Sequence, residues 1–271
     1  CGSSKFPSPC VLLISFTIIP KINHILEKTP HVMYNQNGEE EFHMKQRLNK
    51  IVDMIPECEI LVDIGTDHAY VPIEAIRRKK CKRAIASDVR KGPILAAGKN
   101  IRSFNLEDRI ETRLGDGLRP VETETLHNSV IVIAGMGGIL IRNILKNGVE
   151  KAEKAKMLLL QPMNAVEVLR KWLGENGFEI CDEELVEEDG KIYVVLSVKW
   201  IGETRDIPLL YRFIGQKLVE KKDPLLKKYL QRQVRIFEKI VAGQEKANVA
   251  VTGIDVNREL LDAFRELMEN L

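Results

Sequence analysis

The chain has few cysteines and arranges none of them as a metal site. Its five cysteines, in 271 residues, include no C-x-x-C pair and lie near no histidine at zinc-ligand spacing. A disulfide-stapled secreted domain would need a denser and more regular cysteine pattern. We therefore expect reduced thiols, a cytoplasmic protein and no bound metal.

Long apolar runs are also missing. Residues 11–19 are apolar, but a helix that spans a bilayer takes about 20 residues. Lys5 precedes this run as in a signal peptide, yet Pro20 and Lys21 end it without a small-residue cleavage site. The sequence predicts no membrane partner.

A large charge of either sign is absent as well. The formal net charge is +2, with 44% hydrophobic and 30% charged residues, as in an ordinary globular protein. Such a balance neither requires nor excludes a polyanionic partner. The sequence sets no oligomeric state, and a monomer fits it.

The first 43 residues differ from the rest. The chain begins with Cys1, whereas a clean amphipathic helix starts at Met44, with Leu48, Ile51 and Ile55 on one face. We expect residues 1–43 to be a disordered upstream extension and Met44 to be the natural start.

Strand-like and helix-like segments alternate from Ile60 to Trp200, which predicts an α/β fold with a mostly parallel sheet. The expected strands are 60–64, 83–88, 109–114, 129–134, 156–160, 178–186 and 191–200. Asp189-Gly190 between the last two is a strong hairpin signal. A terminal antiparallel hairpin is not typical of a dehydrogenase half, and fits a Rossmann-like class I methyltransferase sheet over residues 44–202.

Residues 203–271 have helical character instead. Three apolar stripes follow one another at helical spacing, led by Leu210, Leu226 and Leu260. They include Phe213, Ile214 and Leu218; Tyr229, Leu230, Val234, Phe237, Ile240 and Val241; and Leu261, Phe264, Leu267 and Met268. We expect a helical, coiled-coil-like C-terminal domain.

The loop after the first strand departs from the glycine pattern of dinucleotide sites. Asp63 and Gly65 stand where such a site begins, but Asp67 and Ala69 replace the later glycines. The charge of Asp67 would oppose a pyrophosphate, which argues against a dehydrogenase. S-adenosyl-L-methionine carries an ammonium and no phosphate, so carboxylates at positions 63 and 67 suit it.

Carboxylates also end the next two strands. Asp88 would accept hydrogen bonds from ribose hydroxyls, and Asp116, before Gly117, from the adenine amino group. Each alone could be an ordinary turn residue, but three at successive strand ends favour a cofactor site. We add His68 to the cofactor contacts, with a polar residue at a helix start as the alternative interpretation.

The fourth loop is the expected place for the methyl acceptor. Three glycines in Gly135-Met136-Gly137-Gly138 would let the backbone approach a flat base closely. The residues assigned here are Ala134 on the cofactor side, Gly135, Met136, Gly137 and Asn164 as catalytic positions, and Gln161 and Met163 as base contacts. Asn164 has an alternative role as the cap of the next helix.

Two basic regions are candidates for binding RNA. The first comprises Arg77, Arg78 and Lys79, and the second Lys227, Lys228 and Arg232. Runs of this kind are usually solvated helix faces, but the acids of this chain gather elsewhere. Contacts to phosphates would make binding depend on salt.

Several strings in the chain resemble the TrmK family of bacterial tRNA methyltransferases that modify N1 of adenine 22. They are D-I-G-T-D-H-A-Y-V-P at 63–72, G-D-G-L at 115–118, I-A-G-M-G-G at 133–138, L-Q-P at 160–162 and E-E-D-G-K at 187–191. The resemblance implies S-adenosyl-L-methionine as cofactor, tRNA as partner and direct attack of adenine N1 on the sulfonium methyl. Some relatives have Asn directly after L-Q-P, whereas Met163 stands here.

The residues leave two alternatives open. The chain could methylate another RNA base or a protein, because a fold alone does not set the acceptor. It could also be a non-catalytic RNA-binding module with a vestigial cofactor pocket, although the complete set of Asp63, Asp88 and Asp116 argues against that.

Overall fold

The computed structural model describes residues 32–34, 40–42, 44–246 and 254–271 and divides the chain into two compact units, Cys1–Met44 and Lys45–Leu271. In the first unit, β1 (Val32–Tyr34) pairs antiparallel with β2 (Glu40–Phe42), a strand pair that we did not expect. Our expectation for the rest of residues 1–43 falls outside the described residues.

The second unit is built on a seven-stranded sheet. Its strands are β3 (Cys58–Ile64), β4 (Cys81–Asp88), β5 (Ile110–Leu114), β6 (Ser129–Met136), β7 (Met157–Pro162), β8 (Phe178–Glu188) and β9 (Lys191–Trp200). The order across the sheet is β5-β4-β3-β6-β7-β9-β8. The strands β3 to β7 pair in parallel, and β9 is antiparallel to both β7 and β8. This confirms the predicted methyltransferase-type sheet. The Asp189-Gly190 turn makes the hairpin, with φ of 51° and 70°.

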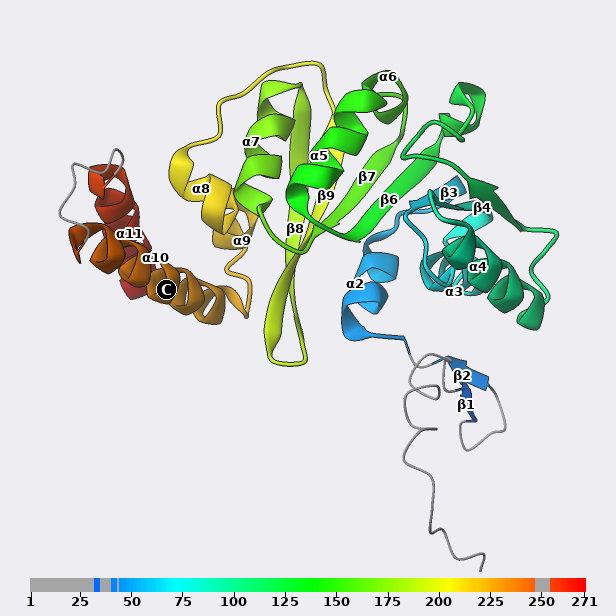
Figure 1. Ribbon diagram of the computed structural model, residues 1–271, viewed down its shortest axis with the longest axis horizontal. Helices are drawn as coiled ribbons and strands as arrows, with labels where there is room; N and C mark the ends of the chain where they lie inside the picture. The colour runs from blue at the N-terminus through cyan, green and yellow to red at the C-terminus, as the bar shows by residue number, and fades with distance from the viewer. Residues whose placement is uncertain (1–31, 35–39, 43, 247–253) are drawn as a thin grey trace, which may run out of the picture. The chain divides into compact units, whose positions relative to one another are not determined.

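Alternate residues of the strands face two helical layers. On one face, Val62 and Ile131 share a core with residues of α5 (Gly138–Asn147) and α7 (Val166–Glu175), which Figure 1 shows crossing in front of the sheet. The other face is covered by α2 (Gln46–Met54), α3 (Tyr70–Arg77) and α4 (Lys91–Ser103). The short elements η1 (Thr123–Leu126) and α6 (Val149–Ala152) lie in connections.

The C-terminal helices are α8 (Leu209–Ile214), α9 (Gln216–Glu220), α10 (Leu226–Lys246) and α11 (Ile254–Glu269). Ion pairs join Arg265 to Glu238 at 2.9 Å and Arg258 to Glu245 at 2.8 Å. The numbers rise on one helix as they fall on the other, so α10 and α11 are antiparallel. This confirms the C-terminal helices. Our division at residue 202 stays a prediction, because residues 45–271 form one compact unit.

The first of the three predicted apolar stripes is divided between two helices, α8 and α9. Gly215, with φ of 91°, separates α8 from α9. A Cβ at this position would lie 2.5 Å from Oε2 of Glu183 and 2.7 Å from Nη2 of Arg170. These two buried side chains form an ion pair of 2.7 Å, so only glycine fits the break.

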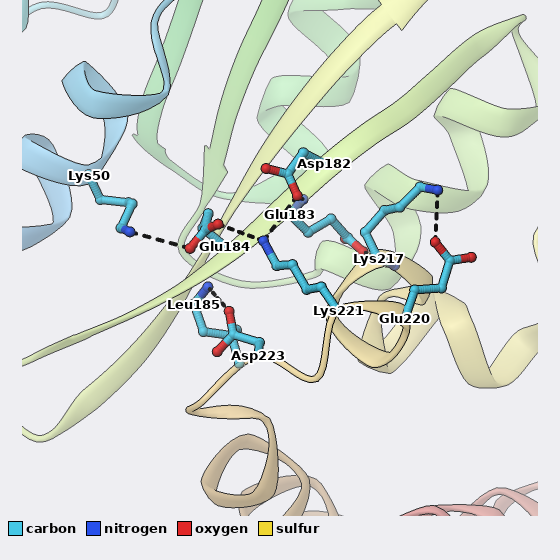
Figure 2. A network of polar contacts seen from close by, with 9 residues as sticks. All are labelled: Lys50, Asp182, Glu183, Glu184, Leu185, Lys217, Glu220, Lys221 and Asp223. Carbon is cyan, nitrogen blue, oxygen red and sulfur yellow. Dashed lines mark hydrogen bonds and ion pairs between the residues drawn. The ribbon is translucent and has the colours of Figure 1, made fainter.

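A network of polar contacts ties the edge strand β8 to α2 and to the segment after α9 (Figure 2). Glu184 accepts hydrogen bonds from Lys50 of α2 at 3.3 Å and from Lys221, which follows α9, at 2.6 Å. Asp223 accepts from the backbone N–H of Leu185 at 3.2 Å. The C-terminal helices are thereby anchored to the sheet. Across residues 44–246 and 254–271, the helices are too short or too polar to cross a bilayer.

Candidate active site

Asp63 is a buried carboxylic acid at the carboxyl end of β3. Its side chain is 7% exposed, and burial raises its pKa from 3.8 to about 6. The negative charge of Asp88 raises this pKa further, whereas a hydrogen bond from the Thr66 hydroxyl opposes the shift. A cation placed beside this carboxyl group would stabilise its ionised form and lower its pKa.

The loop after Asp63 is set by two backbone positions. Gly65 has φ of 80° and donates its N–H to the carbonyl of Ser87 at 2.7 Å. A Cβ at Gly65 would lie 1.9 Å from Cε of Met136, so the first loop closes directly against the fourth. Ala69, at φ of 57°, donates its N–H to Oγ1 of Thr66 at 3.1 Å. Sequence reasoning missed Thr66; its signal is a hydroxyl residue shortly before a helix start.

Asp67 and His68 lie on the solvent side of this loop. The Asp67 side chain is 72% exposed, and Nε2 of His68 lies 3.5 Å from its Oδ2. The His68 ring stacks on Tyr70 with 5.1 Å between ring centroids. Both residues are therefore at the open side of the loop, where Asp67 repels anions and is available to a cationic ligand.

Asp88 and Asp116 follow at the same edge of the sheet. Asp88 is 6% exposed and its Oδ1 accepts from the backbone N–H of Arg90 at 2.7 Å. Its carbonyl accepts from Gly115 at 3.0 Å, which joins the second and third loops. Asp116 is 60% exposed, and Gly117, at φ of 54°, packs on Ile144. A cavity of about 610 Å³ extends from Asp116 and Gly117 along α5 and α6.

The glycine loop, residues 135–138, spans the end of β6 and the start of α5, and it lies against the loop after β7. The N–H of Met163 donates to the carbonyl of Met136 at 2.8 Å, and a Cβ at Gly137 would lie 2.9 Å from Oδ1 of Asn164. The predicted catalytic positions thus come together, with Ala134 at the end of the same strand. The alternative role of Asn164 as a cap is wrong, because α7 begins after Ala165 with no side-chain cap.

Gln161 does not face a ligand, which corrects one expected base contact. It is fully buried, and its Oε1 accepts from the N–H of Gly135 at 3.1 Å and from Nη1 of Arg47 at 2.6 Å. Its Nε2 donates to the carbonyl of Pro162 at 3.0 Å. Gln161 therefore holds the glycine loop in place from behind.

Arg47 is a second residue that sequence reasoning missed. Its side chain is 14% exposed, and its guanidinium lies over the Tyr193 ring, 5.5 Å from the centroid. Its backbone N–H donates to Oε2 of Glu188 at 2.9 Å. A single arginine on an amphipathic helix gives no sign of such a role. Through Gln161, Arg47 links α2 to the backbone of the glycine loop.

The first basic region lies at the opposite edge of the sheet. Arg77 ends α3, and Arg78 and Lys79 follow it in the connection to β4, whereas the four loops follow the carboxyl ends of the strands. Arg78 makes ion pairs of 2.7 Å with Asp53 and Glu74. RNA contact through these residues stays a prediction, and the structure does not bring them to the candidate site.

The second basic region lies closer to it. Lys227 is exposed near the start of α10, and Lys228 forms an ion pair with Glu187 of β8. Arg232 lines a cleft of about 410 Å³ together with Met163 and Asn164 of the loop after β7. This cleft places a candidate RNA-binding residue beside a candidate catalytic one.

Among residues 44–246 and 254–271, no group of three or more His, Cys, Asp or Glu side chains is arranged to hold a metal ion. The residues at the carboxyl ends of β3 to β6 are instead carboxylates and glycines. This arrangement suits an organic ligand with a cationic end and several hydroxyl or amino groups, next to an open backbone for a flat acceptor.

Comparison with known proteins gives a consistent result. The Methyltransferase domain family matches residues 44–196. The tRNA (adenine(22)-N(1))-methyltransferase of Bacillus subtilis is 34% identical over 212 residues, which cover 74% of this chain and 87% of that protein. The crystal structure of the B. subtilis m1A22 tRNA methyltransferase TrmK has 31% identity and a TM-score of 0.69, covering 84% of this chain and 97% of its own.

A Streptococcus pneumoniae structure in complex with S-adenosyl-L-methionine has 33% identity and a TM-score of 0.73, and covers 83% of this chain and 100% of its own. The matches to the solved structures cover more of the chain than residues 44–196, which the domain family matches. The chain belongs to the tRNA (adenine(22)-N(1))-methyltransferase family.

Proposed function

We propose that this protein transfers a methyl group from S-adenosyl-L-methionine to N1 of adenine 22 in tRNA. The observation that carries the proposal is the meeting of two loops. Gly65, two residues after buried Asp63, lies against Met136 of the glycine loop. A cofactor held by the first loop would therefore present its reactive group to an acceptor at the second. The similarity to the B. subtilis enzyme supports the same reaction.

The residues present fit the cofactor. Asp63 and Asp67 would hold the ammonium of the methionine end, Asp88 the ribose hydroxyls and Asp116 the adenine amino group. A pyrophosphate would meet the same four carboxylates, which disfavours a dinucleotide. When bound, S-adenosyl-L-methionine supplies a methyl group on a positively charged sulfur. The S. pneumoniae relative binds this cofactor.

The acceptor needs little chemical help from the protein. N1 of neutral adenine has a lone pair and no proton, so it attacks the methyl group directly without a general base. The glycine loop would let backbone groups approach the ring, while Asn164, against Gly137, supplies an amide at its edge. The main contribution of the protein is then to align the two reactants and to favour the charge that develops on the ring.

The substrate also sets the partner and the compartment. The B. subtilis relative is named for tRNA, so we assign tRNA as the partner of this chain. Because tRNA is made and used in the cytoplasm of bacteria such as B. subtilis, we propose the cytoplasm as the compartment of this protein.

A methylation assay tests this function. The full chain would be incubated with radiolabelled cofactor and unmodified tRNA, then the RNA digested and its methylated nucleoside identified. We expect N1-methyladenosine from tRNA with adenine 22 and none from tRNA with guanine 22. Asp63→Ala, which removes the buried carboxylate, should abolish cofactor binding in calorimetry and with it the transfer.

Other outcomes would contradict the proposal in distinguishable ways. Methylation that persists with guanine 22, or a different methylated nucleoside, would show another acceptor. Tight tRNA binding without any methyl transfer would indicate a non-catalytic RNA-binding module.

A further inference from the structure

A cleft of about 410 Å³ lies where three parts of the chain meet. One wall is the loop from Pro162 into α7, a second is the start of β9, and the third is α10. Its lining includes Met163, Asn164, Glu167, Lys191, Arg232 and Gln233. Its volume is in the range of small-ligand pockets, about 300–1,000 Å³.

The cleft shares a wall with the glycine loop. A Cβ added to Gly137 would lie only 2.9 Å from Oδ1 of Asn164. The preceding residue, Met163, donates its backbone N–H to the carbonyl of Met136. Asn164 therefore has the acceptor position on one side and the cleft on the other. An RNA strand whose target base lies at the glycine loop would place a neighbouring nucleotide in the cleft.

The walls have the chemistry of a nucleotide site. The lining includes two exposed cations, Lys191 and Arg232, and only one carboxylate, Glu167. Met163 is 45% exposed and offers a polarisable apolar surface to a base. Asn164 and Gln233 add amides, which can donate to and accept from the edge of a base.

The start of β9 is an open strand edge at the cleft. Pairing between β7 and β9 ends at the Leu160–Leu196 pair, so residues 191–195 of β9 have no β7 residue opposite them. Nη1 of Arg232 donates to the carbonyl of Ile192 at 3.3 Å, which holds the guanidinium at the rim. The cation is thus already positioned by the fold.

We propose that this cleft binds the nucleotide next to the target adenine in the tRNA, with its phosphate on Arg232 and Lys191 and its base against Met163. The proposal rests on the proposed function. An enzyme that draws a base out of a stacked helix must provide contacts for what it unstacks, and positive grooves with polarisable surfaces do so in single-strand binding. The C-terminal helices then complete the substrate site.

Steady-state kinetics with the full chain test the phosphate contact. Arg232→Gln should raise the KM for tRNA about tenfold and leave kcat and the affinity for S-adenosyl-L-methionine within about twofold, because a phosphate contact acts on binding alone. Arg232→Lys should restore much of the loss. Arg235→Gln removes the same charge from an exposed position of α10 outside the cleft lining and is the matched control.

Equal effects of Arg232→Gln and Arg235→Gln, or a loss confined to kcat, would overturn the assignment. If the parent protein transfers no methyl to tRNA, the proposed function fails instead. If the parent methylates tRNA and Arg232→Gln leaves the KM unchanged, the proposed function holds and the proposed role of the cleft is refuted.

Disulfide trapping gives a second readout that does not depend on activity. The tRNA would carry a short thiol tether on the nucleotide before or after adenine 22. Gln233→Cys should be trapped by one of these RNAs, whereas Gln231→Cys, an exposed position of α10 outside the cleft lining, should not. The parent, with half-buried Cys181, sets the background. Equal trapping at both positions, or trapping at neither, would refute the proposal.

Discussion

Asp63, the first carboxylate of the proposed cofactor site, has a strongly perturbed electrostatic environment. The fold buries its carboxyl beside a second acid, Asp88, and raises its pKa to about 6. Since the folded pKa is above the ordinary value of 3.8, ionising Asp63 costs stability as pH rises from about 4 to about 6. A bound ammonium would recover that cost, and Asp63 would then couple cofactor binding to proton release.

This coupling predicts a pH dependence. The affinity for S-adenosyl-L-methionine should be highest near pH 7 and fall below pH 6, approaching tenfold per pH unit well below it, because binding then requires a proton to leave Asp63. Calorimetric titration of the full chain between pH 8 and pH 5 measures it. The Asp63→Asn variant should bind S-adenosyl-L-methionine weakly at every pH, and its affinity should not fall below pH 6. An affinity of the parent protein that stays flat across this range would show that Asp63 does not face the cation.

Some individual residues could be assigned from sequence and others could not. Asp63 and Asp88 stand at strand ends, and the ends of parallel strands meet at one edge of a sheet, so their positions were predictable. Arg47 lies far away in sequence and reaches the glycine loop only through Gln161. Gln161 itself was misassigned, because nothing in the sequence tells a buried amide from an exposed one.

At the scale of elements, the junction of α8 and α9 shows how a helix pattern is overridden. The apolar stripe through Phe213 and Leu218 continues at helical spacing, yet the chain turns at Gly215. Nη1 of Arg170 in α7 bonds the carbonyls of Arg212 and Phe213 at 2.8 and 3.1 Å. These carbonyls are left free by the break, and the buried arginine satisfies them.

Two glycine substitutions should therefore have opposite effects on stability. Gly215→Ala places a methyl group against the Arg170–Glu183 pair at a left-handed φ and should lower the free energy of unfolding by about 2–4 kcal/mol. Gly243→Ala, inside α10 with open space around it, should raise it by about 0.5–1 kcal/mol. Urea denaturation measures both. A neutral Gly215→Ala would mean that the junction relaxes freely.

At the scale of the whole molecule, the two basic regions have different relations to the active site. The strands separate the edge with Lys79 from the edge with the four loops, a length of about 20 Å for strands of this size. Lys227 lies on α10, the helix that also lines the cleft beside Asn164. We expect the tRNA to be held mainly on the α10 side.

The salt dependence of tRNA binding tests this expectation. Lys227→Gln should reduce the slope of log Kd against log salt concentration by about 0.7–0.9, the value for one lost phosphate contact. Lys79→Gln removes the same charge at the opposite edge and should leave the slope unchanged. Filter binding over a range of salt concentrations measures the slopes. A larger effect at Lys79 would show that the RNA reaches across the molecule.

The sequence by itself determined the order of strands and helices, the terminal hairpin and the acidic strand ends. These follow from local periodicity and turn chemistry, which act over a few residues, and from the rule that carboxyl ends of parallel strands share an edge. Only the tertiary structure decided that Gln161 and Arg47 support the glycine loop, that Gly215 breaks a helix, and that α10 meets Asn164 across a cleft. Those features depend on contacts between residues distant in sequence, and local patterns carry no record of which side chains will be buried together.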